Sequence, residues 1–392
     1  MIASAAVSRL NSTYNFPKER RVDKAINFTA SLLFQIGAYL TDPICKAHEF
    51  YAIASVTEKT VFKIVFIITA VALLALSLVT TIPGALFRFL ANRIERNPFI
   101  CWQGKEAKRI GEDKKFTISS WNICCMVAGF SIGENLMPWA YRIDKIIGDI
   151  VGKGADVNCL YETFDATAAF YIKERLRKHG YNHFYFNIGS RAFGVSSGIM
   201  IASKYKVEDP EFTIFPKKSL LGATKFSSKG VFGFTLTSRN RPFARIHATH
   251  LQHSEVAQAP TIDEKRAREV QMNLISQKVQ AYLKKYPNIC SVVTGDLNLD
   301  DREFRELHLE DMYDKGDIVG PETFGGNVSQ QTGPLNLDHT MALRGSLQSI
   351  NSVVDDTNDY NPIDLQGEGH APSDHKLLFT EIVLNMKEPT FL

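Results

Sequence analysis

Two long stretches without charged side chains stand near the start of the chain, at residues 25–41 and 64–87. The second is long and apolar enough to cross the hydrocarbon core of a bilayer, whereas the first is short for a spanning helix. Basic clusters lie outside the pair, before the first stretch at Lys18, Arg20, Arg21 and Lys24, and after the second at Arg88, Arg93 and Arg96.

Lysine and arginine concentrate on the cytoplasmic side of membrane segments, so both flanks are expected on that face. The pattern predicts a helical hairpin, spanning or re-entrant, that anchors the chain to one membrane. The alternative is a pair of helices buried in a globular protein. We therefore divide the chain into a membrane-associated region, residues 1–97, a juxtamembrane linker, residues 98–114, and a catalytic domain, residues 115–392, whose position is predicted to be the cytoplasmic face.

From residue 115 onward the hydrophobic pattern alternates between strand and helix. Residues 166–179 predict a helix that stops at Gly180, and residues 262–285 predict a long amphipathic helix with an apolar core stripe. Short β-branched and apolar runs predict strands at residues 116–123, 155–162, 198–203, 245–252, 291–295 and 335–343, with one more after His375. The pattern indicates a mixed α/β domain.

Composition narrows this picture only slightly. The chain has 392 residues, of which 45% are hydrophobic and 22% are charged, so it can bury a full core. The net charge of +3 does not require a nucleic-acid partner. Six cysteines follow no disulfide or zinc spacing, and we expect them to be reduced core residues.

Polar residues stand where several predicted strands end. Asp296 and Asn298 follow a buried strand, and in an extended chain they point to the same side. A carboxylate beside an amide suits a hard divalent cation together with a phosphate oxygen, although Gly-Asp and Asn after a strand also occur in ordinary turns. Similar strand ends carry Asn122, Glu162, His250, and Asp374 with His375.

The order of these motifs resembles the endonuclease/exonuclease/phosphatase superfamily. The matching segments are Trp121-Asn122, Tyr161-Glu162, residues 198–204, Thr249-His250-Leu251, residues 295–298, Leu337-Asp338-His339 and Ser373-Asp374-His375. The resemblance implies a four-layer α/β sandwich, in which two mixed sheets are flanked by helices, and Mg²⁺-dependent cleavage of phosphate esters, with Mn²⁺ as a possible substitute. It also implies that Glu162, Asn122 and Asp296 bind the metal, that His375 is the general base, and that Asp338 orients it.

Within the superfamily the chain looks most similar to membrane-anchored neutral sphingomyelinases. The local matches are Glu162-Thr-Phe-Asp165, Arg96-Asn-Pro-Phe99 and Ser227-Ser-Lys229-Gly230. This implies a membrane-bound phosphodiesterase that cleaves sphingomyelin to ceramide and phosphocholine, with anionic lipids as activators and no nucleic-acid substrate. Lys229 then belongs to the catalytic set. Thr224 stands where the animal enzymes have an aspartate that pairs with this lysine.

The remaining roles follow from phosphoryl chemistry. Asn298 and His250 are expected to hydrogen-bond the developing charge on the phosphoryl oxygens. For His250 the alternatives are a metal ligand or the acid that protonates the leaving group, and Asp374 joins the same catalytic set. A nuclease, an inositol-polyphosphate 5-phosphatase and a non-enzymatic membrane scaffold are the competing functions. The sequence identifies no protein partner.

Overall fold

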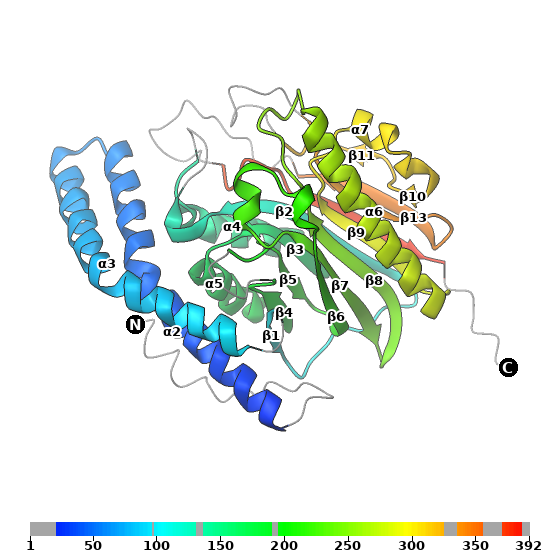
Figure 1. The fold of residues 1–392 in the computed structure, drawn as a ribbon, viewed down its shortest axis with the longest axis horizontal. Helices are drawn as coiled ribbons and strands as arrows, with labels where there is room; N and C mark the ends of the chain where they lie inside the picture. Colours follow the sequence, from blue (N-terminus) through cyan, green and yellow to red (C-terminus); the bar gives the residue numbers. More distant parts are fainter. Residues whose placement is uncertain are drawn as a thin grey trace.

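Two β-sheets face each other at the centre of the molecule, and helices cover their outer faces (Figure 1). The computed structural model describes residues 21–95, 98–130, 136–189, 195–324, 335–355 and 371–385, and for residues 21–24 it describes the backbone alone. Within these residues the chain forms the four-layer α/β sandwich that the sequence predicted.

The first sheet has eight strands in the order β1-β4-β5-β3-β2-β14-β13-β11. It is mixed, because β2 pairs with β3 and β11 pairs with β13 in parallel while the other neighbours are antiparallel. Its strands are β1 Ile100–Gln103, β2 Lys115–Cys125, β3 Val157–Thr163, β4 His183–Phe186, β5 Met200–Ser203, β11 Ile318–Val319, β13 Leu347–Val354 and β14 Leu378–Leu384.

The second sheet has six strands in the order β10-β12-β9-β8-β7-β6, and only its β8–β9 pair is parallel. These strands are β6 Lys206–Ile214, β7 Gly230–Ser238, β8 Arg241–His250, β9 Cys290–Asp296, β10 Tyr313–Asp314 and β12 Asp338–Leu343.

Three hydrophobic layers hold the sandwich together. The middle layer lies between the sheets and contains Phe116, Tyr161, Phe232 and Val292. One outer layer packs α4 Trp139–Lys153 and α5 Ala166–Leu176 on the first sheet, and the other packs α6 Ile262–Lys285 on the second. The single-turn elements are η1 Val127–Gly129, η2 Arg177–His179, η3 Lys217–Ser219, η4 Gly222–Phe226, α7 Asp301–Glu306 and η5 Leu309–Asp311.

The N-terminal region is a pair of long helices, α2 Arg21–Val56 and α3 Thr60–Ile94. Both extend beyond the predicted stretches, and α3 continues through Pro83 to Ile94. Small buried residues recur every seven positions along α3, at Ala70, Ser77, Gly84 and Ala91. They allow close packing on α2: a Cβ atom added to Gly84 would lie 2.9 Å from the carbonyl oxygen of Gly37. Small residues of this kind are typical of helix pairs in membranes.

The two helices have different surroundings. Helix α2 packs on the sandwich, where the Thr167 hydroxyl donates to the carbonyl of Ala38 and the ring of Phe34 contacts Phe170. Helix α3 is largely exposed and projects from the domain (Figure 1). Among the described residues α3 is the one helix long and apolar enough to cross a membrane. The first predicted membrane segment is therefore part of a helix that docks on the domain.

The predicted linker, residues 98–114, contains a strand of the first sheet. Strand β1 pairs with β4, and Phe99 packs edge-to-face against Tyr185 and Phe232 in the core between the sheets. Burial of these apolar residues explains the strand, so the sandwich begins before residue 115. The predicted motif at Arg96-Asn97 lies outside the described residues.

Candidate active site

Three neighbouring strands of the second sheet bring predicted site residues side by side. His250 is the last residue of β8 and Asp296 the last of β9, and the two are partners in the parallel register. Asp338, the first residue of β12, is the antiparallel partner of Asp296. The register of the three strands thus places His250, Asp296 and Asp338 in one row, at the end of the sheet where β8 and β9 finish and β12 begins.

The first sheet supplies the opposite side of the site. Asn122 comes from β2 and Glu162 from β3, and the segment leading into β14 supplies His375. Glu162 has φ +56°, a left-handed conformation that strains a residue with a side chain and that is common at functional sites. The site therefore lies where the two sheets meet.

Asp296 is the centre of the polar contacts. Its Oδ2 atom accepts a hydrogen bond from Asn122 Nδ2 at 3.0 Å and lies 3.4 Å from His250 Nε2 and 3.7 Å from His375 Nε2. Its Oδ1 atom accepts from the backbone N–H of Asn298 at 3.1 Å. Four predicted site residues thus surround one buried carboxylate.

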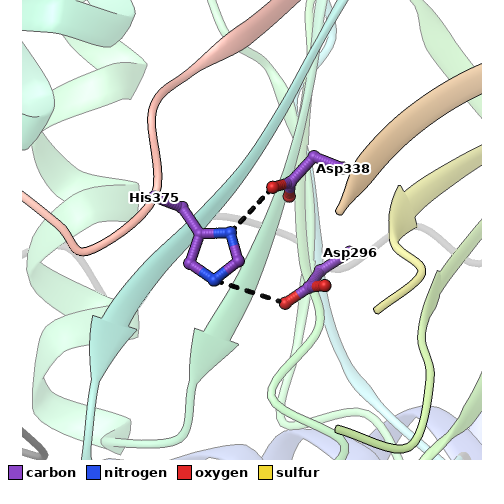
Figure 2. A group of neighbouring side chains, drawn as sticks. All are labelled: Asp296, Asp338 and His375. Atoms are coloured by element: carbon purple, nitrogen blue, oxygen red, sulfur yellow. Dashed lines mark hydrogen bonds and ion pairs between the residues drawn. The ribbon is translucent and has the colours of Figure 1, made fainter. Parts of the chain in front are cut away.

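His375 is held between two aspartates (Figure 2). Its Nδ1 atom lies 2.7 Å from Asp338 Oδ2, and Asp338 is fully buried. This contact fixes the ring orientation and leaves Nε2 facing Asp296. Burial disfavours the charged imidazolium, yet the carboxylates of Asp338 and Asp296 outweigh burial and raise the pKa of His375 to about 10.

The carboxylates of the site require positive charge. Burial, together with the neighbouring Asp374 and Asp296, raises the pKa of Glu162 to about 7. Burial also raises the pKa of Asp296. Oxygen donors crowded in this way are the ligands that Mg²⁺ and Mn²⁺ prefer, so Glu162, Asp296 and Asn122 fit a hard divalent cation. Asp296, Asp338 and His375 also place potential ligand atoms within 4.8 Å of one another.

Asn298 has an amide group ready for a ligand. The residue is left-handed, with φ +51°, and its backbone N–H is already bonded to Asp296. Its buried Nδ2 atom has no hydrogen-bond partner among the residues that the structure describes. Because such groups are costly to leave unpaired, this amide is suited to donate to an oxygen of a substrate.

Lys229 and Thr224 do not contact each other in the way that the family pattern pairs its lysine and aspartate. The buried Lys229 donates from Nζ to the carbonyl of Leu251 at 2.6 Å, directly after His250. The Thr224 hydroxyl lies 2.6 Å from Gln252 Oε1. Burial lowers the pKa of Lys229 to about 8 against the opposing influence of Asp296 and Glu162.

Two supporting contacts were not predicted from the sequence, although Ser373 itself belongs to the matched Ser373-Asp374-His375 segment. The Ser373 hydroxyl donates to the carbonyl of Asn122 at 2.6 Å and lies 3.1 Å from Asp374 Oδ1, which places Asp374 beside the metal-binding residues. The buried guanidinium of Arg142 donates to the carbonyls of Ile123, Cys124 and Pro372. It therefore ties the bulge after Asn122 to the segment that carries His375. The only sequence signal was an arginine within the apolar stripe of α4.

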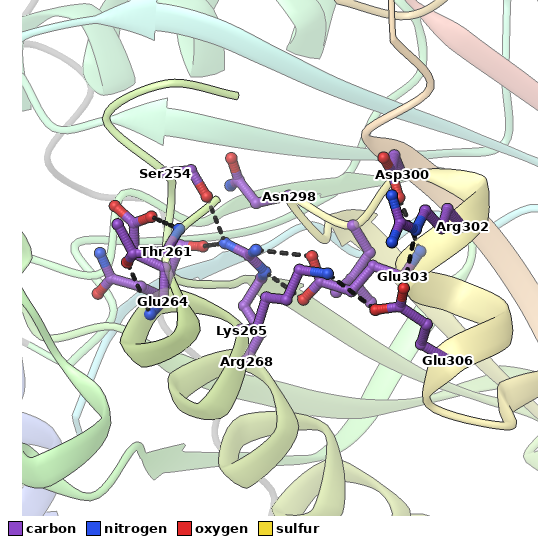
Figure 3. A network of polar contacts seen from close by, with 12 residues as sticks. Ser254, Thr261, Glu264, Lys265, Arg268, Asn298, Asp300, Arg302, Glu303 and Glu306 are labelled. Atoms are coloured by element: carbon purple, nitrogen blue, oxygen red, sulfur yellow. Dashed lines mark hydrogen bonds and ion pairs between the residues drawn. The ribbon is translucent and has the colours of Figure 1, made fainter. Parts of the chain in front are cut away.

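A buried ion pair supports the loops after His250 and Asn298 (Figure 3). Arg268 of α6 donates from Nε and Nη2 to both carboxylate oxygens of Glu303, at 2.8 and 2.7 Å. Its Nη1 atom donates to the carbonyl of Gln252 and to the Ser254 hydroxyl. One side chain thus joins the loop after β8 to α7, which follows the Asn298 loop.

All the predicted site residues lie in this region: Asn122, Glu162, Lys229, His250, Asp296, Asn298, Asp338, Asp374 and His375. Their placement is an observation, and their catalytic and metal-binding roles stay predictions.

Comparison with known proteins shows similarity at the level of structure. The sequence matches no protein-family model and no curated protein. Sphingomyelinase C from Streptomyces griseocarneus superposes with a TM-score of 0.54 at 16% identity, covering 68% of this chain and 99% of that one. Beta toxin from Staphylococcus aureus gives 0.56 at 17% identity, with coverage of 68% and 99%.

Two further solved structures share the architecture of this chain. Truncated TDP2 from Caenorhabditis elegans superposes with a TM-score of 0.51 at 16% identity, covering 69% of this chain and 97% of that one. An endonuclease/exonuclease/phosphatase protein from Beutenbergia cavernae gives 0.50 at 16% identity, with coverage of 69% and 72%. The chain therefore has the fold of the endonuclease/exonuclease/phosphatase proteins, and a sphingomyelinase C is among the structures that it resembles.

Proposed function

We propose that this protein is a Mg²⁺-dependent, membrane-bound phosphodiesterase that hydrolyses sphingomyelin to ceramide and phosphocholine. The observation that carries the proposal is the buried Asp338–His375 pair, whose free imidazole nitrogen faces Asp296 at the meeting point of the two sheets. The likeness to sphingomyelinase C supports the choice of substrate.

In this mechanism His375 takes a proton from the attacking water through Nε2, and Asp338 keeps the proton on Nδ1. The base must be neutral to do so. Positive charge bound at Glu162 and Asp296 counteracts the carboxylates that raise the pKa of His375, which brings this residue toward the range where it can accept a proton.

Glu162, Asp296 and Asn122 are the residues that would hold the divalent cation, which when bound polarises a phosphoryl oxygen. Asn298 donates its free amide to the phosphoryl group, and Lys229 adds positive charge beside His250. Burial lowers the pKa of His250 well below its ordinary value, so this imidazole is neutral and hydrogen-bonds rather than carrying charge.

Helix α3 provides the proposed membrane attachment. It exposes large apolar side chains, among them Ile68, Val71, Leu78 and Ile82, that water would otherwise contact. Basic residues at its C-terminal end, including Arg88 and Arg93, favour the cytoplasmic face and anionic lipids. We expect high salt to leave the full-length protein in the membrane fraction and detergent to release it, because salt does not screen apolar burial. Release by salt alone would contradict this attachment.

The deciding experiment compares three substrates with the purified full-length protein. We expect Mg²⁺-dependent release of phosphocholine from sphingomyelin vesicles, faster when anionic phospholipid is included, and no nicking of supercoiled DNA. The nuclease alternative has structural support, since an endonuclease/exonuclease/phosphatase protein superposes with a TM-score of 0.50. Efficient nicking with intact sphingomyelin would favour that alternative, and dephosphorylation of soluble inositol phosphates would favour a phosphatase.

A further inference from the structure

The outer face of the second sheet changes character along helix α6, which covers it (Figure 1). Under the N-terminal half of α6 the contact is apolar, with Met272 and Ile275 in the same cluster as Val231 and Val293. Under the C-terminal half the sheet presents Arg245 and His247 from β8, and a cavity of about 530 Å³ separates sheet and helix. A polar hollow thus lies beside the apolar contacts that Val279 makes in the same half of the helix.

Buried polar atoms without partners gather on this face. Within the described part of the chain, Arg245 Nε, His247 Nε2, Ser291 Oγ and Thr237 Oγ1 make no hydrogen bond. All four residues point outward, because their strand neighbours Ile246, Val292 and Leu236 belong to the core between the sheets. Of these four residues, Arg245 and His247 line the cavity. Native structures rarely leave such groups unpaired, and two of them in the wall of one cavity point to a ligand that supplies hydrogen-bond acceptors.

Arg245 is the central cation of this cavity. Its side chain is 3% exposed and its guanidinium lies 4.6 Å from the ring centre of Tyr282. Nη1 donates to the carbonyl of Asp209 and to the Thr235 hydroxyl, whereas Nη2 has only a loose ion pair with Glu211 Oε2 at 3.8 Å. A Cβ atom on Gly233 would lie 2.6 Å from Nη2, so glycine at this position makes room for the guanidinium.

The opening of the cavity adds two lysines and two tyrosines. Lys278 Nζ lies 2.6 Å from Glu211 Oε1, and the Glu211 side chain is 54% exposed. Lys285 lies 5.1 Å from the ring centre of Tyr286, which contacts Tyr282. Three cations therefore converge on a space whose acidic lining residues are Glu211, which pairs with Arg245 and Lys278, and Asp209.

We propose that this cavity, lined by Arg245, His247, Lys278 and Lys285, binds the phosphate group of a small anionic molecule or lipid headgroup at a second site, separate from the catalytic centre. The phosphate replaces the Glu211 carboxylate as the acceptor for Arg245 and Lys278, and the tyrosine rings contact the remainder of the ligand. Strand β8 connects the two sites, since His247 precedes His250 by three residues, roughly 10 Å along a strand. The proposal does not depend on which substrate the catalytic centre cleaves.

The test is a binding titration of the full-length protein in detergent with EDTA present, so that no divalent cation holds phosphate at the catalytic centre. Phosphocholine is titrated by calorimetry as the soluble arm, and vesicles containing phosphatidic acid are used in a flotation assay as the lipid arm. The variants are Lys278→Gln and Glu211→Gln. The matched control is Lys265→Gln on the same helix, because Lys265 is as exposed as Lys278, at 34%, and pairs with Glu306 in the same way at 2.8 Å.

We expect saturable binding in at least one arm, weakened about tenfold by Lys278→Gln, strengthened by Glu211→Gln and unchanged by Lys265→Gln. The strengthening in Glu211→Gln is diagnostic, because loss of a competing carboxylate improves binding only if phosphate takes its place. No binding in either arm, or equal effects of Lys278→Gln and Lys265→Gln, would overturn the proposal. Binding that both pocket variants leave unchanged would assign the phosphate to another site and would also overturn it.

Discussion

The buried pair between Arg268 and Glu303 gives the sharpest prediction about stability. The two side chains are 0% and 4% exposed, and the Arg268→Met substitution leaves the Glu303 carboxylate buried without its partner. Breaking a buried ion pair from one side costs about 3–5 kcal/mol, which includes the price of an unpaired buried charge. Unfolding of a sandwich of roughly 290 residues has an entropy of about 0.6 kcal/mol/K, so each kcal/mol lowers the melting temperature by about 1.6 °C and we expect a fall of about 5–8 °C.

The control pair lies on the same helix. Lys265 and Glu306 are 2.8 Å apart, but their side chains are 34% and 42% exposed. Water and salt screen such a pair, so Lys265→Met should cost less than about 1 kcal/mol. Thermal unfolding of the full-length protein in detergent, followed by circular dichroism, compares the two substitutions directly.

A double substitution separates loss of the pair from loss of packing. Arg268→Met combined with Glu303→Leu removes both charges, and apolar replacements of a buried pair are often neutral or stabilising. We therefore expect the double variant to melt well above Arg268→Met alone. The reasoning would be refuted if Arg268→Met and Lys265→Met gave equal melting temperatures, because burial would then have no influence on the worth of the pair.

Three further predictions concern the catalytic centre and pH. His375→Asn should lower phosphocholine release by about 100- to 10,000-fold without lowering the melting temperature. Asp338→Asn, which loses the carboxylate that orients the ring, should also lower phosphocholine release. Mg²⁺ added after EDTA should restore turnover and raise the melting temperature of the wild type, but not that of Glu162→Gln. Burial lowers the pKa of His183 to about 4, so between pH 6.5 and 4 the unfolded chain binds a proton that the folded chain does not. The free energy of unfolding therefore decreases as the pH decreases through this range. In His183→Gln, the loss of unfolding free energy between pH 7 and pH 5 should be smaller than in the wild type by about 1–2 kcal/mol. An equal loss in both proteins would contradict the lowered pKa of His183.

Strong patterning of the strands predicted a mixed α/β domain, whereas the four-layer sandwich followed from the resemblance of the ordered strand-end motifs to a known superfamily. Asp296 and His250 could be placed together, since parallel neighbours end at the same edge of a sheet. The role of β1 was missed because four residues after a membrane segment carry too little periodicity to show that they pair with β4. The docking of α2 was also missed, since an uncharged run has the same composition whether it contacts lipid or protein.

The contacts of Arg142 and Ser373 could not be predicted because their partners are backbone carbonyls, although Ser373 itself stands in the matched Ser373-Asp374-His375 segment. Any residue can supply a carbonyl, so no side-chain motif marks the contact. The pairing of Lys229 with the carbonyl of Leu251 is hidden for the same reason. Sequence motifs identify groups that act on a substrate more readily than groups that hold those groups in place.

The catalytic centre is assembled across the seam between the two sheets. The hydrogen bonds Asn122–Asp296 and His375–Asp338 each join a segment of one sheet to a strand of the other, as does the bond from the Tyr161 hydroxyl to the carbonyl of Thr294. A sliding of one sheet over the other by a fraction of a hydrogen-bond length would misalign the base without unfolding either sheet. Turnover is therefore expected to be more sensitive than the melting temperature to a small change in the alignment of the two sheets. The shared apolar core around Phe116 and Phe232, which holds the two sheets together, therefore affects turnover through the alignment of the proposed site.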